Sequence, residues 1–283
     1  MATRTKIKLD PLMIDGHDVG RVLITGASAG IGAELAREFA RQGHRLTLVA
    51  RRRAKLAALA AELEAEYYVD VRTIVQDLTK PTGPAAVVKA ARADGEIGIL
   101  VNNAGVIDIG PFAASRTDKL VNLVNLNVRA LTELTSLLVP GMVKRGFGRI
   151  LNVASLAAFQ PVAAMAAYAA SKAYVLALTE AMSEELKGSG VTTTALCPGV
   201  TDTDMATEIQ AGSPAAAKLP KQLISDPADV AREAYKALMA GQVVVVPGLP
   251  NQITAALAQV TPHWLTRYLT GLAARRADWL KGS

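Results

Sequence analysis

Tyr168 and Lys172 are the residues of this 283-residue chain whose types and spacing point most directly to chemistry. On a helix, residues four apart lie about one turn apart on the same face. An unperturbed tyrosine has a pKa of about 10, and a neighbouring ammonium group lowers that pKa by stabilising the phenolate. Such a phenol can exchange a proton with the oxygen of a carbonyl group that gains or loses hydride. The pair alone also occurs by chance on surface helices.

Ser155 strengthens the case for a catalytic site. It lies thirteen residues before Tyr168 and two residues after an apolar run at residues 149–153 that is typical of a buried strand. Ligands of open α/β sheets bind outside the carboxyl ends of the strands, which is where this serine would lie. Its hydroxyl could hydrogen-bond a substrate oxygen, and its combination with the tyrosine and lysine is much less likely by accident.

A second chemical signal is the glycine-rich turn formed by Gly26, Gly30 and Gly32. It follows an apolar run at residues 21–25 and precedes a helical pattern that begins near Ile31. Glycine allows a tight turn and a close approach of the backbone to a pyrophosphate, and the helix start offers free N–H groups to phosphates. Three glycines also suit a purely structural turn, but their place between a strand and a helix favours a dinucleotide site.

The end of the second apolar run indicates which dinucleotide is bound. An NAD site usually has an acidic residue there, whereas this chain has Arg51, Arg52 and Arg53 and no carboxylate before Glu62. A carboxylate would repel a 2′-phosphate, and arginine can bind one through two hydrogen bonds. The sequence therefore favours NADP (NADPH), although the same arginines would also suit an ordinary surface turn.

The elements that must position these residues alternate regularly along the chain. Strands are predicted at residues 21–25, 46–50, 71–75, 98–101, 149–153, 191–196 and 242–246, and helices at 31–42, 54–66, 84–94, 117–145 and 166–187. Such alternation is typical of βαβ units. We therefore expect an α/β, doubly wound, mostly parallel seven-stranded Rossmann-like sheet with helices on both faces.

No linker-like stretch interrupts this alternation, so a single domain is expected over residues 1–283. Residues 1–19 are predicted as an N-terminal arm, 20–248 as the core and 249–283 as a C-terminal helical extension. The one cysteine, Cys197, excludes an intramolecular disulfide, and the three scattered histidines give no reason to expect a metal site. The chain shows no secretory signal and no spanning helix, and its charge of +6 is dispersed. A cytoplasmic protein that does not bind nucleic acid is expected.

Taken in order, these motifs resemble the single-domain, Tyr–Lys-dependent short-chain dehydrogenase/reductase family. The resemblance covers residues 20 to about 250 and is specific because many separate motifs agree. The matching positions are 25–32 (TGASAGIG), Asp77, 102–105 (NNAG), Asn127, Ser155, Tyr168, Lys172 and the Pro-Gly motif that ends at Thr203.

The resemblance implies a role for each catalytic position. Tyr168 would be the acid/base, and Lys172 would lower its pKa and also bind the nicotinamide ribose. Ser155 would polarise the substrate carbonyl, and Asn127 would support a water-mediated proton relay.

The resemblance also implies cofactor contacts. Asp77 would contact the adenine. The adenine pocket would be lined by Asn103, Ala104 and Gly105. The nicotinamide carboxamide would be held by Val200 and Thr203. Many NADP-using relatives have a basic residue where this chain has Ala29, so the 2′-phosphate would depend on Arg51, Arg52 and Ser28.

The expected function is an NADP(H)-dependent oxidoreductase that transfers hydride between the nicotinamide and a carbonyl or secondary alcohol. A catalytically silent NADP-sensing protein and a peripheral membrane reductase of lipid 3-keto substrates stay open as alternatives. A lid is expected between residues 205 and 227, and its apolar residues favour an apolar or mixed substrate. By resemblance, a homodimer or homotetramer would pair through the helices at 117–145 and 166–187.

The C-terminal extension holds both tryptophans and several arginines, at helical spacing. It could pack on the protein or lie in a membrane interface. Because its basic residues are few, we expect it to be ordered against the protein and to shape the substrate site or the oligomer, and membrane contact is the less favoured alternative.

Overall fold

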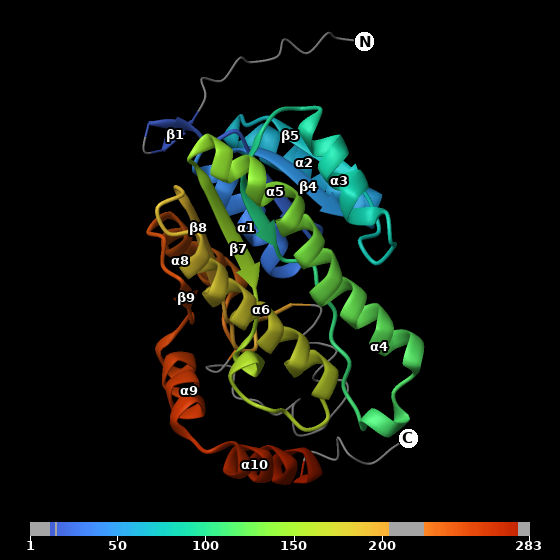
Figure 1. Ribbon diagram of the computed structural model, residues 1–283. Helices are drawn as coiled ribbons and strands as arrows, with labels where there is room; N and C mark the ends of the chain where they lie inside the picture. Colours follow the sequence, from blue (N-terminus) through green and yellow to red (C-terminus); the bar gives the residue numbers. More distant parts are fainter. Residues whose placement is uncertain (1–11, 15, 204–223, 277–283) are drawn as a thin grey trace.

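A seven-stranded parallel sheet forms the centre of the computed structural model, which describes residues 12–14, 16–203 and 224–276 (Figure 1). The strand order is β5-β4-β3-β6-β7-β8-β9, and every neighbouring pair is parallel. The strands are β3 (Arg21–Thr25), β4 (Arg45–Ala50), β5 (Val71–Val75), β6 (Ile97–Asn102), β7 (Gly148–Val153), β8 (Val191–Leu196) and β9 (Val244–Val245). The predicted fold class is confirmed, and each predicted strand is present with ends that differ by two residues or fewer.

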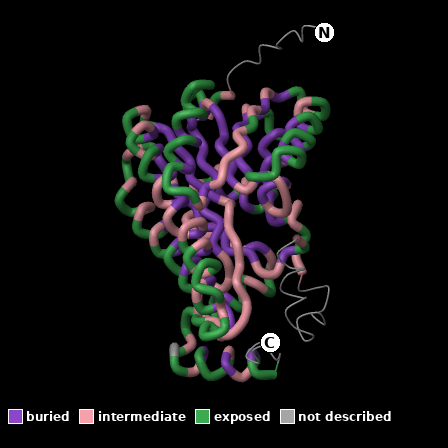
Figure 2. Tube along the Cα trace, turned by 90° about the vertical axis from the view of Figure 1, so that its right-hand side faces the viewer, coloured by how far each residue is buried: buried purple, intermediate pink, exposed green. Residues whose placement is uncertain are grey.

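Helices cover both faces of this sheet. One face is covered by α1 (Gly30–Arg41), α2 (Arg53–Tyr67) and α8 (Pro227–Met239), and the other by α3 (Gly83–Arg92), α5 (Leu131–Arg145) and α6 (Ala166–Glu185). On α1, Leu35, Ala36 and Phe39 recur at helical spacing, and all three are fully buried against the sheet. Figure 2 shows the resulting buried layer running through the middle of the molecule.

The chain reverses its direction across the sheet next to β3. From β3 it passes outward to β4 and β5 on one side, then returns to β6 and continues to β9 on the other. The switch point therefore lies between β3 and β6, where the loops that follow the two strands separate and leave a crevice. The glycine turn follows β3 and the segment Asn103–Gly105 follows β6, so both lie at this point.

The helical region predicted at 117–145 is not one regular helix. It consists of α4 (Thr117–Val124), a π-helical segment η2 (Asn125–Ala130) and α5. Insertions of this kind into an α-helix are often found at functional sites. Here the π-helical segment contains Asn127.

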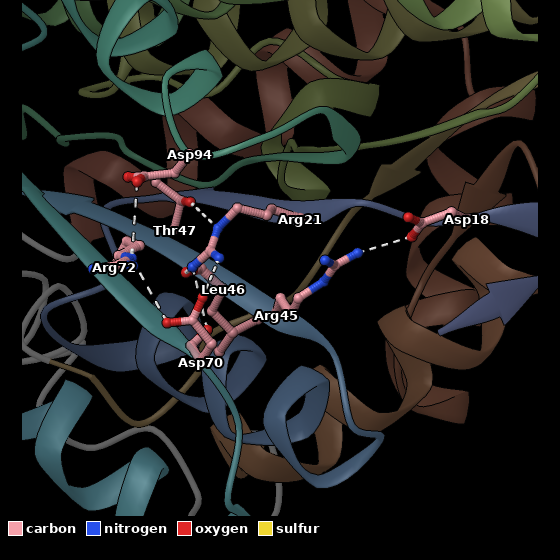
Figure 3. Close-up of polar contacts among 8 residues, drawn as sticks. All are labelled: Asp18, Arg21, Arg45, Leu46, Thr47, Asp70, Arg72 and Asp94. Carbon is pink, nitrogen blue, oxygen red and sulfur yellow. Dashed lines mark hydrogen bonds and ion pairs between the residues drawn. The ribbon is translucent and has the colours of Figure 1, made fainter. Parts of the chain in front are cut away.

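Within the segment predicted as an N-terminal arm, two short strands pair as a small antiparallel hairpin. Its strands are β1 (Met13–Ile14) and β2 (His17–Asp18). Beside it, at the amino edge of β3 and β4, Arg21 is buried and pairs with Asp70, and Asp18 pairs with Arg45 (Figure 3). These contacts tie the hairpin and three strands together at the edge opposite the crevice.

Beyond β9 the chain forms α9 (Leu249–Val260) and α10 (His263–Arg276), at the lower end of the molecule in Figure 1. The first of these packs on the 3-10 helix η3 (Leu156–Phe159). Most of the predicted lid lies outside the described residues. Within the described part of the chain, no helix is both long and apolar enough to cross a membrane.

Candidate active site

Three of the four predicted catalytic side chains come from two neighbouring elements. Ser155 follows β7 by two residues and begins η3, where its hydroxyl accepts a hydrogen bond from the amide of Ala157 at 3.2 Å. Tyr168 and Lys172 lie on one face of α6, and both are buried. The Lys172 Nζ atom lies 5.7 Å from the centre of the Tyr168 ring. The fold therefore brings the serine, tyrosine and lysine together at the carboxyl edge of the sheet.

Tyr168 and Ser155 are joined by a hydrogen bond between their side chains. Burial raises the pKa of the Tyr168 phenol above its ordinary value, and the hydrogen bond with Ser155 acts in the opposite direction. The Tyr–Lys spacing alone led us to expect a lowered pKa, but burial outweighs the neighbouring groups. In this state the phenol is a proton donor at neutral pH.

Lys172 is tied to the strand that precedes Ser155. Its Nζ atom donates a hydrogen bond to the carbonyl oxygen of Val153 at 2.7 Å. Burial lowers the pKa of Lys172 to about 8, because an ammonium group loses solvation inside the protein. Near physiological pH, Lys172 is therefore close to the pH at which it changes between the ammonium and the neutral amine.

Asn127 lies next to the catalytic helix but does not line the cavity. Its side chain donates to the carbonyl of Val106 at 3.0 Å and to the hydroxyl of Ser171 at 3.1 Å, and accepts from the amide of Val106 at 3.0 Å. A Cβ atom added to Gly105 would come within 3.3 Å of the Asn127 carboxamide oxygen and 3.5 Å of Lys172 Nζ. Asn127 thus holds the loop after β6 against the catalytic helix.

The glycine turn has the backbone geometry that its sequence predicts. Gly26 and Gly30 have φ values of 67° and 54°, in the left-handed region that favours glycine. A Cβ on Gly26 would lie 2.8 Å from the Cα of Ala104, and one on Gly30 would lie 3.0 Å from the side chain of Thr203. No side chain caps the start of α1, so its first N–H groups remain available to an anion.

Thr25 and Asn103 join the glycine turn to the loop after β6. The Thr25 hydroxyl accepts hydrogen bonds from the amides of Asn103 and Ala104 at 3.0 and 3.1 Å. The Asn103 side chain donates to the carbonyls of Thr25 and Gly26 at 2.9 and 3.3 Å. Gly32 is packed beneath this bridge, where a Cβ would lie 2.3 Å from the Asn103 amide nitrogen, so its role is in packing.

Arg51 and Arg52 are exposed where β4 ends, and Arg52 donates a hydrogen bond to the hydroxyl of Ser28 at 3.2 Å. Asp77 lies after β5 and accepts hydrogen bonds from the hydroxyl and amide of Thr79 at 2.7 and 2.9 Å. Burial alone would raise the pKa of Asp77, but the Thr79 hydrogen bonds and the nearby Arg51 hold it below its ordinary value. The guanidinium groups of Arg51 and Arg52 and the carboxylate of Asp77 therefore line the same part of the cavity.

These groups line a single cavity of about 700 Å³. All the predicted site residues line this cavity except Gly32 and Asn127. Ile31, Gly105 and Val200 are among the lining residues. The sequence analysis missed one part of the wall, which is formed by Ile107, Leu156, Ala157, Gln160, Val162, Met165 and Thr254. These side chains belong to loops, to η3 and to α9, and no motif marked them.

The comparisons with known proteins agree with this geometry. The model of the short chain dehydrogenase family matches residues 20–214. The ketoacyl reductase HetN of Nostoc sp. is 36% identical over 241 residues, which cover 84% of this chain and 82% of that protein.

Two solved structures are similar over nearly the whole chain. A short-chain dehydrogenase from Sphingobium yanoikuyae in complex with NADPH is 36% identical with a TM-score of 0.73, covering 90% of this chain and 93% of that one. The bulky-bulky ketone specific alcohol dehydrogenase from Comamonas testosteroni is 32% identical with a TM-score of 0.73, covering 91% and 95%. The chain therefore belongs to the short-chain dehydrogenase/reductase family of oxidoreductases.

Proposed function

We propose that this protein is an NADP(H)-dependent ketone reductase or alcohol dehydrogenase. The observation that carries the proposal is the convergence of Ser155, Tyr168 and Lys172 in the same cavity as a glycine-rich turn that can cradle phosphates. Bound NADP(H) supplies the hydride donor or acceptor. The protein must then orient the substrate oxygen and exchange one proton with it.

Tyr168 exchanges that proton. In the reductive direction its hydroxyl donates a proton to the substrate oxygen as the carbonyl carbon gains hydride, and the phenolate left behind is neutralised from solvent. A raised pKa suits this role because the phenol holds its proton at neutral pH until the substrate oxygen becomes basic. Ser155, already hydrogen bonded to Tyr168, is placed to donate a hydrogen bond to the same oxygen.

Lys172 and Asn127 support the phenol. The Lys172 ammonium, when protonated, stabilises the phenolate electrostatically. Its proximity to Gly105 supports the contact with the nicotinamide ribose that the family resemblance implies. The side chain of Asn127 is hydrogen bonded to Val106 and Ser171, and from this position it would support a water-mediated proton relay, as the family resemblance implies.

The residues present fit a dinucleotide. Gly26 and Gly30 leave backbone space that a Cβ atom would fill, and the uncapped start of α1 offers N–H donors to a pyrophosphate. Asp77 lines the cavity and would contact the adenine. Asn103, Ala104 and Gly105 also line the cavity and would form the adenine pocket, and Val200 and Thr203 would hold the nicotinamide carboxamide.

We favour NADP(H) over NAD(H) because the 2′-phosphate would meet Arg51 and Arg52. The hydrogen bond from Arg52 to Ser28 orients one guanidinium toward the glycine turn before any ligand binds. A relative with bound NADPH supports the same preference. Arginine can contact phosphate through two parallel hydrogen bonds, which gives geometric specificity as well as affinity.

The substrate is proposed to be a ketone, or the corresponding secondary alcohol, with apolar substituents. Among the described residues that line the cavity, the charged ones are Arg51, Arg52, Asp77 and Lys172, all assigned to the cofactor or to proton transfer. The remaining wall near Tyr168 is formed by Ile107, Val162 and Met165. An alcohol dehydrogenase described as specific for bulky-bulky ketones is among the similar structures, in line with such a wall.

A homodimer or homotetramer is proposed from the helices at 117–145 and 166–187. Val121, Val124, Leu137 and Tyr174 project from these helices and are exposed in the single chain. Burying such side chains against a second copy would remove apolar surface from water. Light scattering at micromolar concentration tests this directly, since a mass of one chain, 29.7 kDa, would contradict it.

The alternative of a silent NADP-sensing protein predicts binding without turnover. It gives no physical reason for a serine beside a buried tyrosine and a buried lysine, whereas catalysis requires all three. The deciding experiment is a panel of ketones with NADPH, followed by the loss of NADPH absorbance and repeated with NADH. Turnover with NADPH supports the proposal; tight NADPH binding with no turnover on any ketone or secondary alcohol favours the silent protein.

A further inference from the structure

Exposed apolar side chains are concentrated at the C-terminal end of the described chain. Among the described residues, fifteen large hydrophobic side chains are exposed, and seven of them lie on α9 and α10. They define what we call the C-terminal apolar surface: Leu249, Ile253, Leu257, Val260, Trp264, Tyr268 and Leu269. Figure 2 shows that the tube at this lower end is mostly exposed.

The side chains on α9 form one stripe. Leu249, Ile253 and Leu257 are four residues apart and Val260 follows three later, a spacing that places all four on the same side of the helix. The opposite side is occupied: Ala255 is buried, and the side chain of Asn251 lies against Gly199. The helix thus packs on the protein with one side and presents a continuous apolar stripe on the other. Val260 is 77% exposed.

The charge of this region has one sign. Between residues 249 and 276 the chain has no aspartate or glutamate and three arginines, Arg267, Arg275 and Arg276, all of which are exposed. Two copies that met through this surface would bring like charges together with no carboxylate from either segment to neutralise them. An anionic surface complements these charges directly.

The aromatic residues favour a lipid surface. Trp264 and Tyr268, four apart on α10, are 64% and 61% exposed. Tryptophan and tyrosine are enriched at membrane–water interfaces, where the ring is apolar and its polar atom stays hydrated. An apolar stripe, two aromatic rings and arginines without acidic residues are the features of helices that lie in the plane of a bilayer surface.

We infer that α9 and α10 form a peripheral docking surface for a membrane that contains anionic phospholipids. The two helices lie on the bilayer with the C-terminal apolar surface inserted at the headgroup level and the arginines among the phosphates. The same helix α9 carries Thr254 of the cavity wall, so the docked surface would lie beside the candidate active site. This inference does not depend on the reaction or on the cofactor.

The test is flotation of the purified full-length protein with vesicles of phosphatidylcholine alone or mixed with phosphatidylglycerol. We expect binding to the mixed vesicles, weakened by salt, and a blue shift of tryptophan fluorescence in a Trp279→Phe variant that reports Trp264 alone. Replacing Arg267, Arg275 and Arg276 by Gln should weaken binding by roughly fivefold per residue. Replacing Ile253 and Leu257 by Ser should weaken it further.

Control variants remove the same charge, or two other exposed large apolar side chains, elsewhere on the protein. The triple variant Lys55→Gln, Lys89→Gln, Lys144→Gln takes three exposed cations from other helices, and Tyr68→Ser with Phe112→Ser takes two exposed aromatic residues. Both control variants should bind vesicles like the unmodified protein. The inference is wrong if the protein ignores anionic vesicles or if the controls and the C-terminal variants lose binding equally. It is also overturned if the Ile253→Ser, Leu257→Ser variant lowers the oligomeric mass in light scattering while vesicle binding is absent throughout.

Discussion

Lys172 donates a hydrogen bond from α6 to the carbonyl oxygen of Val153, 2.7 Å away at the end of β7. Two residues beyond Val153 the same chain segment presents Ser155, which is hydrogen bonded to Tyr168. The lysine and the serine are thus held by one strand end, and the tyrosine is held between them. Their relative positions therefore depend on how α6 packs against β7. A change in this packing would alter the geometry of the three catalytic side chains.

Tyr168→Phe should lower turnover by about a hundred- to ten-thousandfold, the range that general acid catalysis contributes. NADPH binding should stay nearly unchanged, because the ring remains and only the proton donor is lost. Steady-state kinetics and fluorescence titration with NADPH measure the two effects. Tyr174→Phe, on the same helix, removes a hydroxyl that is hydrogen bonded to Thr132 and should leave both unchanged. Substantial activity in Tyr168→Phe would refute the proposed mechanism.

Ser171→Ala should lower kcat by roughly fivefold, since it removes the hydroxyl that accepts a hydrogen bond from Asn127, worth about 1 kcal/mol. Ser183→Ala is the matched control. Both hydroxyls donate at 2.7 Å to the carbonyl three residues earlier on α6, but only Ser171 meets Asn127. If Ser171 positions the catalytic helix, kcat falls while the dissociation constant of NADPH does not. Equal kinetics in the two variants would show that the contact is not functional.

The parts of this site that could be predicted from sequence are those whose residues are close together in the chain. The glycine turn, the Tyr–Lys spacing and the arginines after β4 are local patterns, and the structure places them in one cavity. The cavity wall formed by Val162, Met165 and Thr254 could not be predicted in this way. Thr254 comes from α9, and its approach to the cavity depends on tertiary packing that no local period reports.

Three structural features were not predicted from the sequence, and each omission has a specific physical reason. The two strands of the β1–β2 hairpin are two residues long, too short for an alternating pattern to be recognised. The π-helical segment around Asn127 differs from an α-helix in its hydrogen-bond register, and the spacing of apolar residues hardly changes across six residues. The predicted packing of the C-terminal extension left out the exposure of its outer stripe, because composition alone does not say which side of a helix is covered.

Replacing Arg51 by Asp and Arg52 by Ala should erode or reverse the preference for NADPH over NADH. A charge-assisted hydrogen bond to phosphate contributes roughly 1.5–3 kcal/mol, which corresponds to about ten- to a hundredfold in affinity. The ratio of kcat/KM for the two cofactors is the measurement. Arg53→Ala is the control, because this exposed arginine is the next in sequence but does not line the cavity. Equal kcat/KM values for NADPH and NADH in the unmodified protein would contradict the proposed cofactor.

His44 should make the protein less stable in mild acid. Burial lowers the pKa of His44 to about 4. An unfolded chain takes up this proton near pH 6.5, so between about pH 6.5 and 4 the unfolded state binds more protons and stability falls as the pH falls. The effect of this one group is on the order of 3 kcal/mol across that window. Urea unfolding at a series of pH values should show a shallower decline for His44→Phe, and an identical decline would remove His44 as the cause.

Arg21 and Asp70 should be energetically coupled at the opposite edge of the sheet. Arg21 is 3% exposed, and its guanidinium contacts the Asp70 carboxylate at 2.5 Å and the hydroxyl of Thr47 at 3.0 Å (Figure 3). Removing one partner of a fully buried pair costs about 3–5 kcal/mol, and the 41% exposure of Asp70 reduces our expectation to about 1–2 kcal/mol for Asp70→Asn. Asp70→Asn removes the negative charge that compensates the buried guanidinium of Arg21.

Arg21→Met retains the buried stem and leaves a carboxylate that water can solvate, so we expect it to cost less than Asp70→Asn. In the double variant the buried charge is gone, and Asp70→Asn should then cost almost nothing further. A double-mutant cycle from urea unfolding at neutral pH measures this coupling. Strict additivity of the two single variants would mean that the ion pair contributes nothing beyond the hydrogen bonds that Arg21 makes to Thr47 and to the carbonyl of Leu46.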